Sequence, residues 1–300
     1  MAEEPEQGPD QVPGRPPNDA AARRWAAVLG SPIAHSLSPI LHRAAYRALG
    51  LAGWSYEAVE CPVEALPARL QQARDDPAFA GYSLTMPLKL AVLPQLDELE
   101  PLAARMGAVN TVTRLGEDDT GLLLGANTDV PGMVQALRKA GVAELAHAVV
   151  LGAGGSAQAA LAALAELGRP HVAALVRRPE RARALRTVAE AVGVPIEVRP
   201  WGAVPDTELV IATTPAGATD GLAADAAAGR WPAGAALFDI LYAPWPTPLA
   251  AAVQARGERV VGGAELLVAQ ALGQVERMTG RSIAPGVLHA ALAGAGRSEP

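Results

Sequence analysis

Residues 149–157 read Val149-Val150-Leu151-Gly152-Ala153-Gly154-Gly155-Ser156-Ala157, and an alanine-rich segment follows them as far as Gly168. The apolar run, the glycines and the alanine-rich segment predict a strand, a tight turn and a helix. Gly152 permits the turn, Gly154 lets the backbone approach a pyrophosphate, and Ala157 lets the helix pack closely on the strand. Glycine-rich turns of this kind also occur without a ligand, but a strand before and a helix after favour a dinucleotide site.

The segments around this turn continue the alternation of strands and helices. The pattern predicts a βαβαβ unit with strands at 147–151, 171–176 and 194–199 and helices at 155–167 and 179–191. Further elements are expected in the order strand 207–212, strand 235–240, helix 247–256, strand 259–261, helix 263–278 and helix 284–293. We expect the last two helices to pack back on the first half of the chain.

The first half begins with a segment of different composition. Residues 1–24 carry five prolines, several acids and few large apolar groups, so we expect a disordered tail. After it the pattern predicts strands at 25–29, 54–59, 81–84, 109–114 and 122–125, helices at 63–73 and 129–140, and helices starting near Ser38 and near Met86. Ser38 is the expected N-cap of its helix, with Pro39 at the first helical position.

Composition limits the partners and the compartment. The formal net charge is −6 and the pI is about 5.5, which argues against a nucleic-acid partner. A single cysteine, Cys61, excludes an internal disulfide and fits a reducing compartment. Apolar runs are interrupted before about 18 residues accumulate, and the acidic, proline-rich N-terminus does not have the pattern of a signal peptide. We therefore expect a cytoplasmic protein that does not bind a membrane.

Two arginines suggest which dinucleotide would bind. A site that prefers NAD has an acidic residue about 20 positions after the glycines, at the tip of the second strand. Here that tip carries Arg177 and Arg178 and no carboxylate. Two guanidinium groups suit a 2′-phosphate, which favours NADP(H) over NAD. The alternative is that both arginines only solvate the end of a strand.

Two further pairs of polar residues are candidates for ligand binding and for proton transfer. Ser36 and Ser38, two residues apart near a helix start, suit either a carboxylate ligand or helix capping. Lys89 and Asp129 each follow a strand, and a lysine beside an aspartate can deliver a proton to a developing alkoxide. Taken alone, both pairs are better explained by capping and solvation. The histidines are scattered along the chain, so no metal site is expected.

Eight segments change this assessment, because together and in this order they resemble the shikimate dehydrogenase family from Trp25 to about Ala291. They are Gly-Ser-Pro-Ile-Ala-His-Ser-Leu-Ser-Pro (30–39), Leu-Thr-Met-Pro-Leu-Lys (84–89), Gly-Ala-Val-Asn-Thr (107–111), Asn-Thr-Asp (127–129), Gly-Ala-Gly-Gly (152–155), Thr-Pro-x-Gly (214–217), Asp-Ile-Leu-Tyr-Ala-Pro-Trp-Pro-Thr-Pro-Leu (239–249) and Leu-Leu-Val-Ala-Gln (266–270).

The resemblance implies reversible reduction of 3-dehydroshikimate to shikimate with hydride from NADPH. It implies that Lys89 and Asp129 are the catalytic pair. The implied substrate-binding residues are Ser36, Ser38, Ser83, Thr85, Asn110, Tyr242 and Gln270. The implied cofactor-binding residues are Gly152, Ala153, Gly154, Gly155, Ser156, Arg177, Arg178, Thr213, Thr214, Pro215 and Gly263.

The chain departs from the family pattern at a few of these positions. Ser83 stands where the family usually has asparagine, and Val176 and Arg178 flank Arg177 in place of asparagine and threonine. Gly262 and Glu265 stand where aspartate and glycine or proline are common. These differences leave open a quinate/shikimate or aminoshikimate-type dehydrogenase, including one that uses NAD. A more remote alternative is a non-catalytic protein that senses NADP or a metabolite, which would not need a proton donor such as Lys89.

The predicted fold is α/β with two domains and a cleft between them. The substrate-binding domain is expected to comprise residues 25–129 and 263–295. A Rossmann-type NADP-binding domain is expected to comprise residues 130–262. The resemblance is compatible with a monomer or a homodimer.

Overall fold

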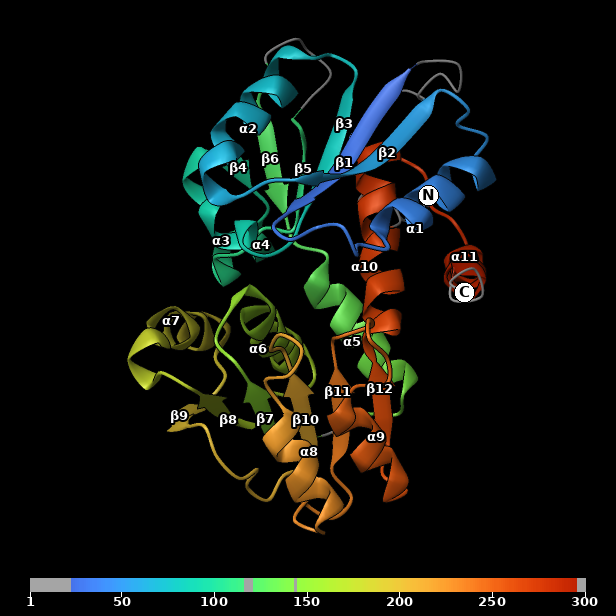
Figure 1. Cartoon of the computed structure of the whole chain (residues 1–300). Coiled ribbons are helices and arrows are strands. Elements are labelled where there is room, and N and C mark those ends of the chain that lie inside the picture. Colours follow the sequence, from blue (N-terminus) through green and yellow to red (C-terminus); the bar gives the residue numbers. More distant parts are fainter. Residues whose placement is uncertain (1–22, 116–120, 143–144, 296–300) are drawn as a thin grey trace, which may run out of the picture.

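The structure, a computed structural model, describes residues 23–115, 121–142 and 145–295, which form two six-stranded sheets (Figure 1). Residues 1–22 of the predicted tail lie outside this described part, and Arg24 already belongs to the first strand. Each sheet has helices on both faces, so the predicted α/β class is confirmed.

The first sheet is mixed. Its strands lie in the spatial order β2 (Trp54–Glu60), β1 (Arg24–Gly30), β3 (Phe79–Leu84), β5 (Thr111–Arg114), β6 (Leu123–Ala126) and β4 (Glu98–Leu99). Strand β5 runs antiparallel to both of its neighbours, and the other pairs are parallel. All six residues of β3 are buried, as expected for a central strand with both faces covered.

Two groups of helices cover the faces of this sheet. One face packs against α1 (Ser38–Ala48), α10 (Gly263–Thr279) and α11 (Pro285–Ala295). The other packs against η1 (Val63–Ala65), α2 (Leu66–Asp75), α3 (Leu88–Ala91), η2 (Leu93–Gln95) and α4 (Pro101–Met106). The last helices of the chain therefore return to the first sheet, as the sequence predicts.

The second sheet is parallel throughout. Its spatial order is β12 (Val260–Gly262), β11 (Ala236–Asp239), β10 (Leu209–Ala212), β7 (His147–Leu151), β8 (His171–Val176) and β9 (Ile196–Pro200). One face packs against α5 (Asp129–Lys139), α6 (Gly155–Glu166) and α7 (Arg183–Val192), and the other against α8 (Asp220–Ala227) and α9 (Pro248–Ala255). The short helix η3 (Pro179–Arg181) precedes α7. The strand order reverses between β7 and β10, and open α/β sheets bind ligands at such a point.

Helices α5 and α10 connect the two sheets. They pack against each other, and Figure 1 shows α10 extending alongside both halves of the molecule. A second connection is a shared apolar cluster, in which Met106 and Ala108 from the first half lie among residues of α6 and α7. The predicted domain boundaries at 129/130 and 262/263 coincide with the starts of α5 and α10 to within a residue, and the division itself stays a prediction.

The predicted elements agree with the structure except in detail. Strand β4 and helices α4 and α8 were not predicted, because β4 has only two residues and the two helices are short. The prediction that Ser38 caps α1 is wrong. The helix begins at Ser38 with Leu37 as N-cap, and the Ser38 N–H donates to Ser36 Oγ at 3.3 Å.

No helix in the described ranges combines the length and the apolar character needed to cross a membrane.

His42 lies on α1 in the core beneath the first sheet. Its ring stacks on Tyr56, with centroids 3.9 Å apart and an angle of 12° between the planes. His42 Nε2 lies 3.2 Å from Gln274 Oε1, while His42 Nδ1 has no partner among the described residues. Burial lowers the pKa of His42 from 6.5 to about 4, against the opposing effect of the hydrogen bond with Gln274.

This pKa predicts how stability depends on pH. The folded pKa lies below the unfolded value, so the contribution of neutral His42 to stability is present above pH 6.5 and is lost as the pH falls towards 4. We expect this group alone to remove about 3 kcal/mol of unfolding free energy over that interval. Urea unfolding of wild type and His42→Asn at several pH values measures it, with the exposed His35→Asn as control. Parallel curves for wild type and His42→Asn would contradict the prediction.

Candidate active site

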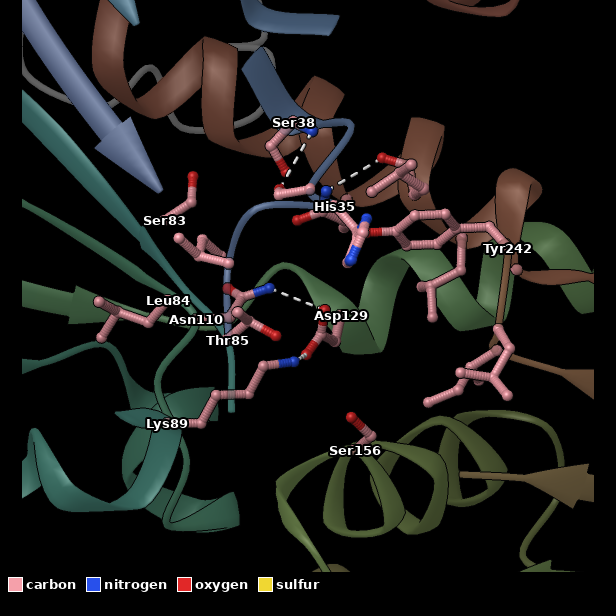
Figure 2. A pocket seen from close by; sticks show the side chains of 18 of the residues that line it. His35, Ser38, Ser83, Leu84, Thr85, Lys89, Asn110, Asp129, Ser156 and Tyr242 are labelled. Carbon is pink, nitrogen blue, oxygen red and sulfur yellow. Dashed lines mark hydrogen bonds and ion pairs between the residues drawn. The ribbon is translucent and has the colours of Figure 1, made fainter. Parts of the chain in front are cut away.

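A pocket of about 320 Å³ lies between the two halves of the molecule (Figure 2). The first half contributes the loop 32–38, the end of β3, Lys89, Asn110 and Asp129. The second half contributes Ser156 and the loop 240–243, and α10, which packs against the first sheet, contributes residues between Gly263 and Gln274. The pocket thus brings together both predicted catalytic residues and every predicted substrate-binding residue: Ser36, Ser38, Ser83, Thr85, Lys89, Asn110, Asp129, Tyr242 and Gln270.

Lys89 and Asp129 form an ion pair in this pocket. Lys89 Nζ lies 2.6 Å from Asp129 Oδ2, and Figure 2 shows the two side chains pointing toward each other. Their side chains are only 16% and 7% exposed, so solvent screens the pair weakly. Lys89 lies on the short helix α3, whose start follows β3, and its carbonyl accepts from the Val109 N–H. An ammonium group and its partner carboxylate therefore face the same pocket.

Asn110 and Asn127 hold Asp129 in place. Asn110 Nδ2 donates to Asp129 Oδ1 at 2.8 Å and to Thr128 Oγ1 at 3.0 Å. Asn127 Oδ1 accepts the backbone N–H groups of Asp129 and Val130, which caps α5. Asp129 is thus not the capping residue. Its carboxylate is available to Lys89, and it lies in the first turn of α5, where the helix dipole favours a negative charge.

Ser36, Ser38 and Tyr242 lie together on another side of the pocket. Ser36 is partly exposed and Ser38 is buried. Burial raises the pKa of the Tyr242 phenol, and the neighbouring Leu37 backbone and Ser36 hydroxyl oppose this rise. Tyr242 follows β11 in the second half, so this contact joins the two halves across the pocket. Three hydroxyl groups in one place suit a carboxylate or a hydroxyl of a ligand.

The glycine turn lies at the carboxyl end of β7, next to this pocket. Gly152 has φ of 113°, and a Cβ there would lie 2.8 Å from Thr213 Oγ1, so only glycine fits. A Cβ on Gly154 would meet no described atom within 4 Å, so the turn is open on that side. Gly154 is also the N-cap of α6, and no side chain of the described residues caps the helix, which leaves the N–H groups of the first turn to a ligand.

The first turn of α6 also approaches the ion pair. A Cβ on Gly155 would lie 3.4 Å from Lys89 Cβ, and Ser156 lines the pocket. A ligand that extends from the glycine turn into the pocket would therefore pass beside Lys89. Gly263, on the far side, is required by packing, because a Cβ there would collide with the Ile240 carbonyl.

The remaining predicted cofactor residues lie outside the pocket lining. Arg177 and Arg178 follow β8, are exposed, and make no ion pair with any residue in the described ranges. Thr213, Thr214 and Pro215 follow β10, next to the end of β7. All five therefore lie at the carboxyl edge of the second sheet, which the glycine turn shares, and their binding roles stay predictions.

Sequence reasoning missed Gln274, which also lines the pocket. Its side chain is buried and contacts both Ser83 and His42. The signal was present, since Gln274 lies four residues after Gln270 in one helix and so on the same face. Within the described part of the chain, no group of three or more His, Cys, Asp or Glu side chains is placed to hold a metal ion.

Comparison with known proteins shows which family this chain resembles. Residues 28–112 match a family model described as the shikimate dehydrogenase substrate binding domain. A shikimate dehydrogenase (NADP(+)) of Thermus thermophilus is 42% identical over 244 residues, which is 81% of this chain and 88% of that protein.

Solved structures of shikimate dehydrogenases are also similar to this chain. The crystal structure of Mycobacterium tuberculosis shikimate dehydrogenase superposes with a TM-score of 0.80 at 40% identity, covering 90% of this chain and 99% of that one. Shikimate 5-dehydrogenase from another strain of Thermus thermophilus, solved with NADP(H) and shikimate, superposes with a TM-score of 0.76 at 37% identity, covering 91% and 99%. On these similarities, the chain belongs to the shikimate dehydrogenase family.

Proposed function

We propose that this protein catalyses the reversible, NADPH-dependent reduction of 3-dehydroshikimate to shikimate. The observation that carries the proposal is the Lys89–Asp129 ion pair, which lies in a pocket bordered by the first turn of α6. The relatives named above are NADP-dependent shikimate dehydrogenases, and one of them was solved with both ligands.

Lys89 and Asp129 would act as an acid–base pair. When bound, the reduced nicotinamide supplies a hydride to the carbonyl carbon of the substrate. The negative charge that develops on the carbonyl oxygen is stabilised by the Lys89 ammonium, which gives that oxygen a proton. In the reverse direction, the neutral amine of Lys89 takes the proton back. Asp129 fixes the direction of the ammonium, and Asn110 fixes Asp129.

The other pocket residues would bind the substrate. Ser36, Ser38 and Tyr242 suit its carboxylate, because their hydroxyls gather on one side of the pocket. Thr85, Ser83 and Gln270 suit the ring hydroxyls. Gln270 Nε2 already donates to the Leu267 carbonyl, which leaves its Oε1 to accept from the ligand.

The dinucleotide would lie along the carboxyl edge of the second sheet. Gly152, Ala153, Gly154, Gly155 and Ser156 suit the diphosphate, since the turn is open at Gly154 and the first turn of α6 has free N–H groups. The exposed guanidinium groups of Arg177 and Arg178 suit a 2′-phosphate. Thr213, Thr214, Pro215 and Gly263 would lie towards the nicotinamide.

We further propose a cytoplasmic location and a protein that is a monomer or a homodimer. Cys61 is a free, buried thiol, as is usual in a reducing compartment.

A steady-state assay tests the proposal. We expect the highest kcat/KM with the pair shikimate and NADP⁺, measured by the absorbance of the reduced nicotinamide. Quinate in place of shikimate and NAD⁺ in place of NADP⁺ are the comparison arms. A higher kcat/KM with either replacement would instead favour the quinate or NAD-using alternative, and no turnover with any pair would favour a sensing role.

Lys89→Met tests the proton donor, because methionine keeps the length of the side chain and removes the ammonium. We expect kcat to fall about 10²- to 10⁴-fold with little change in shikimate affinity. The chain contains one other lysine, Lys139, which is exposed and pairs with Glu265, so Lys139→Met is the matched control. Unchanged turnover in Lys89→Met, in a variant with wild-type circular dichroism, would remove Lys89 from the mechanism.

Replacing Arg177 and Arg178 together by serine tests the 2′-phosphate contacts. We expect KM for NADPH to rise about 10- to 100-fold and KM for NADH to change less than about threefold, because only NADPH carries the phosphate. Arg186→Ser, on the exposed face of α7, is the control. An equal rise for both cofactors would show that the arginines do not read the phosphate.

A further inference from the structure

The Asn110 carbonyl fixes the orientation of a buried amide. It accepts from the Leu84 N–H at 2.8 Å and from Gln274 Nε2 at 3.3 Å. A carbonyl oxygen can only accept, so the amide nitrogen of Gln274 must face it. Gln274 Oε1 therefore points the other way, toward Ser83 and His42.

This orientation determines two further protons. Gln274 Oε1 lies 2.9 Å from Ser83 Oγ and 3.2 Å from His42 Nε2. An amide oxygen has no proton to give, so both partners donate to it. The Ser83 proton is thus committed to Gln274, and His42 is the tautomer with its proton on Nε2. In this tautomer His42 Nδ1 carries only a lone pair, which fits its having no partner among the described residues.

Tyr56 completes the arrangement. Its hydroxyl donates to Ser83 Oγ at 2.6 Å. Ser83 Oγ has one proton and two lone pairs, of which the proton and one lone pair are now used. One lone pair remains, and Ser83 lines the pocket. In this network Ser83 can accept a hydrogen bond from a ligand but cannot donate one.

We propose that Ser83 is a specificity-determining residue that binds only a hydrogen-bond donor of the substrate ring, and that Gln274, which accepts the Ser83 proton, is the positioning residue that makes it so. Tyr56 occupies one lone pair of Ser83, and the tautomer of His42 reports the orientation of the Gln274 amide. The proposal rests on the proposed function, in which the ligand is shikimate or its ketone. It explains how an oxidised substrate is oriented. Lys89 donates and Ser83 accepts, and Figure 2 shows them apart, with Thr85 and Asn110 between. A ring turned so that its carbonyl faces Ser83 would place two acceptors together.

The tautomer of His42 tests the network without any ligand. We expect ¹⁵N-histidine NMR of the wild-type protein at neutral pH to show His42 with its proton on Nε2. A proton on Nδ1 would mean that the Gln274 amide is turned around, and it would overturn the proposal.

Binding of analogues tests the specificity. Shikimate is compared with analogues that lack one ring hydroxyl or carry fluorine in its place, by calorimetry without cofactor. At one ring position we expect the wild type to bind the deoxy analogue at least about tenfold more weakly than shikimate, and the fluoro analogue more weakly still, because fluorine offers only an acceptor. Fluoro analogues that bind within about threefold of shikimate at every position would overturn the proposal.

Three variants separate positioning from structure. Gln274→Met frees the Ser83 proton, so the fluoro analogue should no longer bind more weakly than the deoxy analogue. Tyr56→Phe leaves that proton on Gln274, so the wild-type order should persist. Ser83→Ala should bind shikimate and the deoxy analogue about equally. Gln254→Met, at an exposed position of α9, is the matched control. An unchanged order in Gln274→Met would overturn the proposal, and if that variant does not fold, Ser83→Ala and the tautomer decide it.

These experiments distinguish a failure of the Ser83 proposal from a failure of the proposed function. If shikimate is oxidised with NADP⁺ but the analogues show no such order, only the role of Ser83 and its network is wrong. If shikimate neither binds nor turns over, the proposed function is wrong, and the assignment of Ser83 to a shikimate hydroxyl is wrong with it.

Discussion

The buried ion pair between Lys89 and Asp129 is the constraint on which the rest of the site depends. Removing two charges from water is costly, and the pair persists only where its geometry and its further hydrogen bonds offset that cost. The structure meets this requirement with groups from several strand ends. Asn110 donates to the second carboxylate oxygen, Asn127 caps the helix that carries Asp129, and a short helix presents Lys89. These elements converge because the two sheets meet along α5 and α10.

A second polar system, which shares Asn110 with the ion pair, extends from the pocket into the core of the first sheet. It begins at a backbone carbonyl, passes through the Gln274 amide, and ends at Ser83, Tyr56 and His42. In such a system the direction of one hydrogen bond determines the next. The pocket therefore has two chemically different sides, a cation at Lys89 and an acceptor at Ser83, and Asn110 contacts both systems, through its side chain and its backbone carbonyl.

Much of the fold could be predicted from local sequence patterns. The glycine turn at 152–155 predicted the β7–α6 unit, because backbone freedom and close packing are read directly from residue size. The resemblance supplied Lys89 and Asp129 as a pair, which the residues alone did not favour. Gln274 was missed because its importance comes from contacts with residues more than 160 positions away in the chain. The predicted N-cap of α1, Ser38, is one residue after the observed N-cap, Leu37. The serine side chain that accepts a backbone hydrogen bond at this helix start is Ser36, not Ser38.

The apolar cluster that contains Met106 and Ala108 bears on how the protein can be divided. These two residues come from the first half, yet they are fully buried among residues of α6 and α7 from the second. Exchange of the second half for the corresponding part of another protein would expose both side chains unless the incoming helices had matching shapes. The two halves are therefore not interchangeable modules, and their sequences are expected to covary at this contact.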